Sequence, residues 1–250
     1  MARFDTIIGL HAVAAALRND PGRIVDLHYK ASRKDRRLEA VVARARQLGI
    51  EVVQSDDREL TRLADGGRHQ GIVARSRAVA LPGEQALFDR LEALETPPLL
   101  LVLDGVTDPH NLGACLRSAD AVGVDAVIVP RDNAVGLTPT VRKVASGAAD
   151  SVLLVQVTNL ARTLERLKAA GVWIVGTTDK GDIPLFQQDL TGSLALVMGA
   201  EGKGLRRLTQ QHCDYLVRIP MRGQVESLNI SVAAGVCLYE ALRQRSAAHR

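Results

Sequence analysis

The sequence predicts an α/β protein with a small α/β unit at residues 1–76, a linker at 77–83 and a larger α/β domain at 84–250 built on a mainly parallel sheet. The length of 250 residues equals roughly 1.7 domains of about 150 residues. A polar stretch around Pro82 and Gly83 interrupts the apolar pattern, as a linker does. From Pro98 onward, nearly continuous apolar strands alternate with helical stretches, which is typical of a buried parallel sheet with helices on both faces.

In the first unit, apolar residues recur at helical spacing between residues 35 and 48, which predicts a helix there. Short strands are predicted at 24–29, 51–53 and 71–74. Within the apolar run 7–17, the positions of Leu10, Val13, Ala14 and Leu17 suit another helix. The run is much shorter than the ~20 residues that cross a bilayer. Because Asp5 and Arg18 flank it, a signal peptide is disfavoured, and we expect a cytoplasmic protein without a membrane segment.

The larger domain is predicted to begin with a helix at about 84–95. Its apolar strands are expected at 99–103, 126–129, 152–155, 172–175, 194–198 and 215–219. Helices are expected mainly at 111–122, 159–170 and 230–244. In parallel sheets ligands bind at the carboxyl ends of the strands, so the loops that follow these strands should carry the chemistry.

The composition is that of an ordinary globular protein, with 46% hydrophobic, 24% charged and 3% aromatic residues. So few aromatic residues argue against an RNA reader built on rows of stacking aromatics. Cys115, Cys213 and Cys237 form no CxxC pair. This favours reduced thiols in the cytoplasm and argues against a structural zinc site.

The net charge of +4 is concentrated at the N-terminus. Residues 1–76 hold 14 Lys and Arg against 10 Asp and Glu, whereas residues 77–250 hold 18 of each kind. The excess suits a polyphosphate partner such as RNA, although a charge run of this kind also suits a solvated helix face. The residues that we expect to bind RNA are Lys30, Arg33, Lys34, Arg36 and Arg37.

The first loop with chemical content runs from Asp104 to Asn111 and leads into a helix that carries Arg117. Arg117 projects well off the apolar face of that helix. For these residue types alone, Asn111 as a helix cap and Arg117 as a solvated side chain would be sufficient explanations.

The second loop, at 198–204, follows a buried strand and contains Gly199, Glu201, Gly202 and Gly204. Its glycine spacing is neither GxGxxG nor GxxxxGK[ST], so a conventional Rossmann or P-loop nucleotide site is unsupported. Glycines at these positions still permit close approach of a ligand to backbone amides. Glu201 also suits a helix N-terminus.

The third loop, at 219–229, leads into a helix that is apolar nearly all round, which implies burial on several sides. Ser227 and Asn229 are both natural N-cap residues. Capping explains one of them but not both, since Leu228 separates them.

Together, in this order and spacing, the three loops resemble the signature motifs of the SpoU (TrmH) family of RNA ribose 2′-O-methyltransferases, within the SPOUT superfamily. The match runs from about Leu99 to the C-terminus. The N-terminal unit, with the segment 69–72, resembles the ribosomal-protein-L30e-like RNA-binding domain found in part of this family. The resemblance is strongest to members that methylate a guanosine ribose in 23S rRNA, in the peptidyl-transferase P loop.

The resemblance implies a deep trefoil knot at the C-terminus, a homodimer with the active site near its interface, and S-adenosylmethionine as cofactor. It assigns cofactor binding to Gly176, Thr177, Gly199, Ile219 and Leu228. It makes Arg117 the catalytic residue that faces the 2′-hydroxyl, with Asn111, Glu201, Ser227 and Asn229 orienting the arginine and the ribose. A guanidinium stays protonated, so we expect it to stabilise the developing alkoxide and bind the adjacent phosphate. We expect no metal.

Two alternatives are open at this point. The substrate could be another rRNA or a tRNA nucleotide, against which the L30e-like domain weighs, since simple tRNA members of the family usually lack it. The protein could also be a ribosome assembly factor without catalytic activity, against which the complete set of motif residues weighs.

Overall fold

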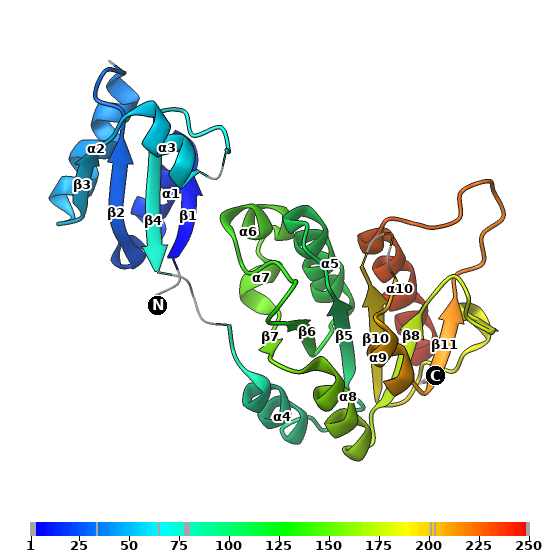
Figure 1. The fold of residues 1–250 in the computed structure, drawn as a ribbon. Coiled ribbons are helices and arrows are strands. Elements are labelled where there is room, and N and C mark those ends of the chain that lie inside the picture. Colours follow the sequence, from blue (N-terminus) through cyan, green and yellow to red (C-terminus); the bar gives the residue numbers. More distant parts are fainter. Residues whose placement is uncertain are drawn as a thin grey trace. The chain divides into compact units, whose positions relative to one another are not determined.

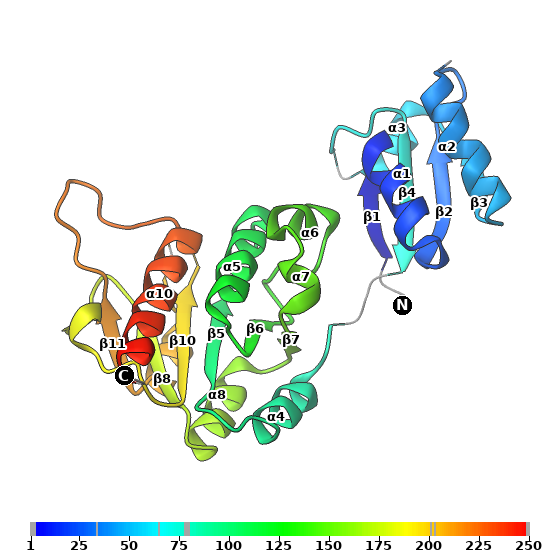
Figure 2. The ribbon, with the colours of Figure 1, turned by 180° about the vertical axis from the view of Figure 1, so that it is seen from behind.

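The structure is a computed structural model that describes residues 4–33, 35–64, 66–77, 81–200, 202 and 204–248. The chain forms two compact units, Met1–Ala80 and Leu81–Arg250, which are described separately (Figures 1 and 2). No helix in the described part of the chain is long and apolar enough to cross a membrane.

The first unit is built on a four-stranded sheet in the order β1-β4-β2-β3. β4 (Ile72–Arg77) pairs antiparallel with both β1 (Phe4–Ile8) and β2 (Ile24–Tyr29), and β3 (Glu51–Gln54) pairs parallel with β2. The main core joins one face of this sheet to α1 (Leu10–Asn19) and α2 (Arg36–Gln47). The short α3 (Asp57–Leu63) packs Leu60 against Val73 of β4 in a separate, smaller cluster. A short 3-10 turn, η1 (Pro21–Arg23), precedes β2.

The helix expected from Leu10, Val13, Ala14 and Leu17 is present as α1. Ile7 and Ile8 belong to β1, where Ile7 pairs with Ala74 of β4, and α1 begins only at Leu10. Gly9 separates the two elements at a φ of 91°, a conformation that glycine adopts readily and that breaks the helical pattern.

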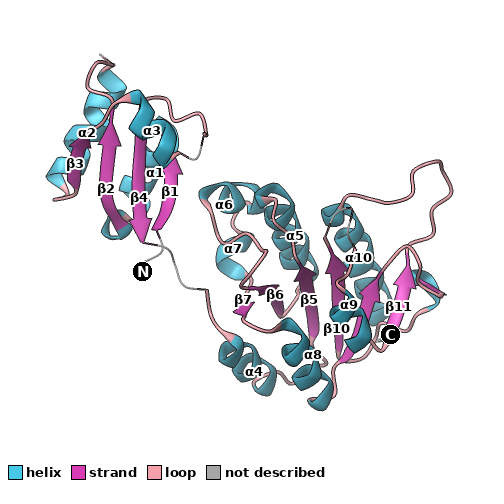
Figure 3. Ribbon diagram, in the orientation of Figure 1, coloured by secondary structure: helices cyan, strands magenta, loops and turns pink. Residues whose placement is uncertain are grey.

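The second unit contains a seven-stranded sheet in the order β7-β6-β5-β10-β8-β11-β9, and every pairing in it is parallel (Figure 3). This confirms the predicted fold class. The strands are β5 (Leu99–Asp104), β6 (Ala126–Pro130), β7 (Leu154–Val157), β8 (Trp173–Thr177), β9 (Ile183–Pro184), β10 (Leu194–Gly199) and β11 (Tyr215–Arg218).

Helices cover both faces of this sheet, because alternate apolar residues of the strands point to opposite sides. One core contains residues from α5 (Pro109–Val122), α6 (Pro139–Ala145), α7 (Ala148–Ser151) and α10 (Ile230–Ala248). The other contains residues from α4 (Glu84–Glu92) and α8 (Leu160–Ala169), together with Leu205 and Cys213, which flank α9 (Arg207–His212). A short 3-10 turn, η2 (Leu185–Gln187), follows β9.

The strand order does not follow the chain order, since β10 lies between β5 and β8. After β11, the chain passes through residues 219–229, and α10 then packs against α5 and β10. This crossed path fits the deep trefoil knot that the resemblance implies, and the knot itself stays a prediction.

Candidate active site

The candidate site lies at the carboxyl edge of the parallel sheet. Since all strands of the second unit run in the same direction, the loops that follow β5, β6, β8, β10 and β11 emerge at one edge (Figure 1). Gly176 and Thr177 end β8, Gly199 ends β10, and Ile219 directly follows β11. The predicted cofactor residues therefore include the last residues of two adjacent strands and the first residue after a third.

A hydrogen bond joins the first and third motifs across 118 residues of sequence. The Nδ2 atom of Asn229 donates to Oδ1 of Asn111 at 3.0 Å. Asn111 is buried within the first turns of α5. The N-cap of this helix is Asp108, whose carboxylate accepts a hydrogen bond from the backbone N–H of His110. The cap explanation for Asn111 is therefore wrong, and its side chain is directed toward the third motif instead.

The third motif uses Asn229 as the cap of α10. Its Oδ1 accepts from the backbone N–H of Ser231 at 2.9 Å and from the Ser231 hydroxyl at 2.6 Å. Ser227 is exposed, and Leu228 is half-buried. Of the two candidate caps, only Asn229 is therefore engaged with the helix, and the side chain of Ser227 is left accessible.

A hollow of about 530 Å³ lies beside the Asn111–Asn229 pair, within the range typical of small-molecule sites. Its walls come from the loop 104–108, from Asn111 and Asn133, from Ala200, Gly204 and Arg206, and from Ile230. The predicted cofactor residues are not part of this wall, and neither is Arg117, which is exposed on α5. The hollow thus lies next to the side chains of Asn111 and Asn229, and it is not lined by the residues at the carboxyl ends of β8 and β11.

The glycines of the second motif are needed by the chain itself. A Cβ atom on Gly199 would lie 2.2 Å from the carbonyl carbon of Gly204 and 2.3 Å from the nitrogen of Leu205. Two backbone hydrogen bonds between Ala200 and Gly204 fold the loop back over this position. Gly199 therefore allows the backbone at Gly204 and Leu205 to pack against it, and the space beside it is not open to a ligand. Glu201 lies outside the described residues.

The other predicted cofactor glycine, Gly176, is also closely packed. A Cβ there would meet Sγ of Cys213 at 2.6 Å and Cδ1 of Leu205 at 2.8 Å. The neighbouring Thr177 hydroxyl donates to the carbonyl of Val197 at 3.1 Å, which ties the end of β8 to β10. These contacts fix the ends of the two strands relative to one another.

An ion pair between a buried aspartate and a half-exposed arginine, which the sequence reasoning missed, anchors the second loop. Asp104, the last residue of β5, is fully buried, and the backbone N–H of Arg206 donates to its Oδ2 at 3.0 Å. The Arg206 guanidinium also binds this carboxylate. An aspartate that ends an otherwise apolar strand is the one sequence signal that could have indicated this role.

The cysteines near the site are not nucleophiles. Burial raises the pKa of Cys115 to about 12, and burial, assisted by the charge of Asp214, does the same for Cys213. These thiols stay protonated at neutral pH. No group of His, Cys, Asp and Glu side chains that could hold a metal ion occurs among the described residues.

In the first unit, the residues predicted to bind RNA divide into two kinds. Lys30 forms an ion pair with Asp57 at 2.8 Å, and Arg33 forms one with Asp35 at 2.8 Å. Arg36 and Arg37 are exposed in the first turn of α2, and Lys34 lies outside the described residues. The hydrogen bond from Lys30 lowers the pKa of Asp57, so this carboxylate is ionised at neutral pH.

Comparison with protein families identifies the chain. Residues 98–239 match the model of the SpoU rRNA Methylase family, which is more than half of the chain. The chain belongs to this family. Residues 6–81 match a second family model, RNA 2'-O ribose methyltransferase substrate binding.

Two known methyltransferases resemble this chain along nearly its whole length, and a third known protein resembles about two thirds of it. A 23S rRNA (guanosine-2'-O-)-methyltransferase from Pseudomonas syringae pv. tomato is 56% identical over 247 residues, which cover 99% of this chain and 98% of that protein. The SpoU methyltransferase AviRb from Streptomyces viridochromogenes, crystallised with AdoMet, is 27% identical, with a TM-score of 0.62 and coverage of 98% and 91%. The A. aeolicus TrmH/SpoU tRNA modifying enzyme is 31% identical, with a TM-score of 0.56, and covers 66% of this chain and 85% of its own.

Proposed function

We propose that this SpoU protein transfers a methyl group from S-adenosylmethionine to the ribose 2′-oxygen of a guanosine in 23S rRNA, in the peptidyl-transferase P loop. The observation that carries the proposal is the Asn111–Asn229 hydrogen bond, which brings the first and third motifs together beside a hollow at the carboxyl edge of the sheet. The similarity to a 23S rRNA (guanosine-2'-O-)-methyltransferase over 99% of the chain supports the choice of substrate.

The strand ends fit the proposed cofactor. Backbone N–H and C=O groups at the ends of β8 and β10 offer hydrogen bonds to an adenine, and Ile219 and Leu228 are half-buried apolar side chains suited to its faces. In this assignment Gly176, Thr177 and Gly199 contribute backbone groups. S-adenosylmethionine, when bound, supplies an activated methyl group on a positively charged sulfur.

The protein's own task is then to place and activate the ribose oxygen. Asn111 and Asn229 orient the ribose, together with Ser227 and Glu201. Arg117 stabilises the alkoxide that develops as the 2′-hydroxyl loses its proton, and it binds the neighbouring phosphate. Because a guanidinium stays protonated, the proton passes to another group, such as the RNA phosphate or water.

A homodimer is part of the proposal. Val232 and Tyr239 on α10 are 52% and 54% exposed, although the rest of this helix is largely covered. They are seven residues apart, so they lie on the same side of the helix and form an apolar face suited to a second copy of the chain. We expect such a protein to work in the cytoplasm, where ribosomes are assembled.

The experiment that tests the proposal offers three purified RNAs, namely 23S rRNA, 16S rRNA and tRNA, from a strain that lacks the gene. With labelled S-adenosylmethionine, we expect label in 23S rRNA alone, at one guanosine that mapping of 2′-O-methyl groups identifies. Label in tRNA would favour the alternative substrate, although the tRNA-modifying relative matches only 66% of this chain. Absence of cofactor binding in calorimetry would favour the assembly-factor alternative.

A further inference from the structure

The hollow of about 530 Å³ beside the Asn111–Asn229 pair, which we call the site hollow, lies to one side of the predicted cofactor residues. Its walls include residues from the loops that follow β5, β6 and β10. The predicted cofactor residues lie on or after β8, β10 and β11. Because β10 stands between β5 and β8 in the sheet, the two sets of loops adjoin there. A second reactant that approaches the cofactor from the β6 side therefore enters the site hollow.

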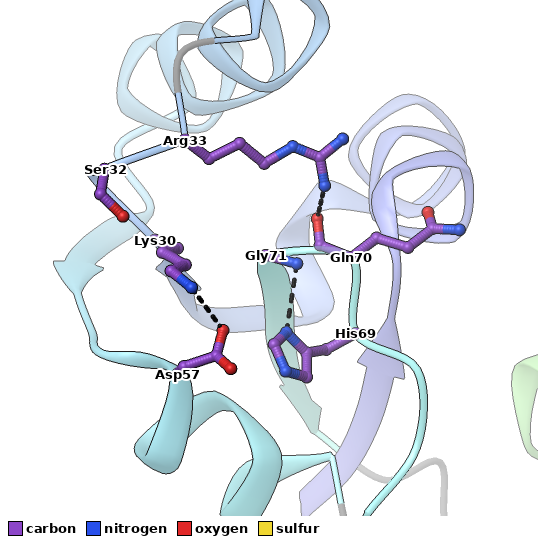
Figure 4. Close-up of a pocket in the computed structure, with 7 residues that line it drawn as sticks. All are labelled: Lys30, Ser32, Arg33, Asp57, His69, Gln70 and Gly71. Atoms are coloured by element: carbon purple, nitrogen blue, oxygen red, sulfur yellow. Dashed lines mark hydrogen bonds and ion pairs between the residues drawn. The ribbon is translucent and has the colours of Figure 1, made fainter.

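The charges of the site hollow suit a neutral group better than a phosphate. Arg206 is the one cation among its described lining residues, and it is bound to the buried carboxylate of Asp104. The remaining charged group in this part of the wall is the carboxylate of Asp108. A hollow in the first unit is of the opposite kind, since two cations, Lys30 and Arg33, line it together with one carboxylate (Figure 4). The site hollow therefore favours a ligand that is uncharged and rich in N–H donors.

Apolar side chains line the site hollow between its polar groups. Val106 and Ile230 are each 5% exposed, and Ala200 is half-buried. A nucleic-acid base has two apolar faces and a polar edge, and a wall of apolar residues with a few polar groups matches this shape. No aromatic ring occurs among the described lining residues, so hydrogen bonds at the edge of the base must provide the selectivity.

Asn133 is fixed in the wall of the site hollow by its backbone and has a free side-chain amide. The N–H of Val135 donates to the carbonyl of Val106 at 3.0 Å, which ties the loop after β6 to the loop after β5. A Cβ on Gly105 would lie 3.8 Å from the carbonyl oxygen of Asn133. The φ of Asn133 is 58°, a value that asparagine adopts more readily than most residues. Its amide forms no hydrogen bond within the described part of the chain, so it is available to a ligand.

Asp108 also has an unused acceptor at the site hollow. Its Oδ1 caps α5 by accepting from the backbone N–H of His110, whereas its Oδ2 has no partner among the described residues. Asparagine caps a helix as well as aspartate does, so capping alone does not require a carboxylate here. The side chain is exposed and lines the hollow. Its second oxygen can therefore accept from an N–H donor of the ligand.

We propose that the site hollow receives the base of the nucleotide to be methylated, and that Asp108 and Asn133 select guanine. The inference rests on the proposed function and names the residues that read the base. Bases that leave a single-stranded loop are read on their Watson–Crick edge, where guanine has N–H donors at N1 and N2 beside the acceptor O6. The Asp108 carboxylate accepts from both donors, and the Asn133 amide donates to O6. Adenine, cytosine and uracil lack this pair of adjacent donors.

The first test removes a donor from the RNA and an acceptor from the protein. Inosine lacks the 2-amino group of guanosine, so 23S rRNA fragments with the P loop are prepared with either nucleoside at the methylated position. We expect the kcat/KM of the wild type to be about tenfold higher for guanosine than for inosine. Asp108→Asn keeps the cap of α5 and should lose this preference. Equal kcat/KM values for the two RNAs with the wild type, or an unchanged preference in Asp108→Asn, would overturn the inference.

The second test changes the Asn133 side chain and keeps its backbone, since glycine and aspartate both accept the positive φ. We expect Asn133→Gly to lower methyl transfer to the guanosine RNA about tenfold, because it only loses a hydrogen bond. Asn133→Asp should lower it about a hundredfold, because its carboxylate faces O6. Gln211→Glu makes the same amide-to-carboxylate change at an exposed residue outside the lining and should keep the wild-type rate. Wild-type rates in both Asn133 variants would contradict the assignment.

Calorimetry distinguishes the base from another possible occupant of the site hollow, the methionine end of the cofactor. We expect S-adenosylmethionine to bind Asn133→Asp with the affinity of the wild type. A changed affinity would place part of the cofactor in the hollow and overturn the inference. Failure of the proposed function is recognised separately, as absence of methyl transfer by the wild-type protein to the guanosine RNA, whereas transfer without discrimination against inosine refutes the inference alone.

Discussion

Arg117 is the residue whose proposed role depends most on its direction. It lies six residues after Asn111 on α5, so the two side chains leave the helix in directions roughly 120° apart. Its side chain is exposed, with no hydrogen bond or ion pair among the described residues, so its removal costs the fold little. We expect Arg117→Ala to keep the unfolding temperature and cofactor affinity of the wild type while methyl transfer falls by about a hundredfold or more. Wild-type turnover in a methyl-transfer assay would exclude the assignment.

Arg206 should matter for stability, because it is the partner of the fully buried Asp104. Replacement by methionine leaves that carboxylate with the backbone N–H of residue 206 as its main donor. We expect Arg206→Met to lower the free energy of unfolding by about 1–3 kcal/mol, because the fully buried carboxylate loses a charged donor that is itself half exposed. Arg207→Met is the matched control, since Arg207 is exposed and unpaired in the described structure, and it should change stability by less than about 0.5 kcal/mol. Equal losses in urea denaturation would contradict this role.

The thiols of the three cysteines should be unreactive in the folded protein. Burial raises the pKa of each thiol to about 12. At pH 8 we therefore expect Ellman's reagent to react with no thiol in the native protein and with three after denaturation. Because the unfolded thiols ionise near pH 9 and the folded ones do not, these groups lower stability as the pH rises from about 9 toward 12. A rapidly reacting thiol in the native protein would show that one of these side chains is accessible.

At the residue scale, the sequence indicated the chemical types of the side chains but not the partners with which they form ion pairs. Lys30 and Arg33 have the charge expected of RNA-binding residues, yet their carboxylate partners Asp57 and Asp35 appear only once the loops are folded together. The pairing of Asp104 with Arg206 joins residues 102 positions apart and has no periodic signal. Spacing along a chain reports faces of helices and strands, but it does not report which loop meets which.

At the element scale, β10 and the loop after it depend on Gly199. A methyl group at this position would overlap the backbone of Gly204 and Leu205, which cannot move without opening the loop. We expect Gly199→Ala to destabilise the second unit by about 3 kcal/mol and to weaken cofactor binding, since overpacking against backbone is poorly relieved. In Gly192→Ala the new methyl group meets no atom within 4 Å, and it should behave like the wild type. Similar melting temperatures for the two variants would show that the loop tolerates the overlap.

Long, strongly periodic elements were the ones that the sequence predicted well. The expected strand at 24–29 and the helices at 35–48 and 111–122 agree with β2, α2 and α5 to within two residues at each end. The polar helix α3 and the two-residue strand β9 were missed, because neither contains enough apolar residues to form a pattern. The strand order, with β10 inserted beside β5, leaves no trace in local periodicity and was not predicted.

At the scale of the whole molecule, each unit has its own core, so the two should be separable. We expect a shortened chain that begins at Leu81 to fold, dimerise and bind S-adenosylmethionine with the affinity of the full chain, because the motifs and α10 all lie beyond that residue. It should lose most of its affinity for 23S rRNA, since the excess positive charge lies within residues 1–76. Calorimetry, light scattering and RNA anisotropy check the three properties. Undiminished RNA affinity would contradict the assignment of RNA binding to the first unit.

Because β10 lies between β5 and β8, the large sheet can be completed only late in synthesis. Leu194 of β10 pairs with Leu99 of β5. The ribosome must therefore add 95 residues after Leu99 before Leu194 is made. At about 5–20 residues per second, this takes on the order of 5–20 s, during which one edge of β5 has no neighbour. The first unit, whose last strand ends at Arg77, can complete its sheet in that time. The nascent chain thus carries a finished RNA-binding unit before its catalytic unit can close.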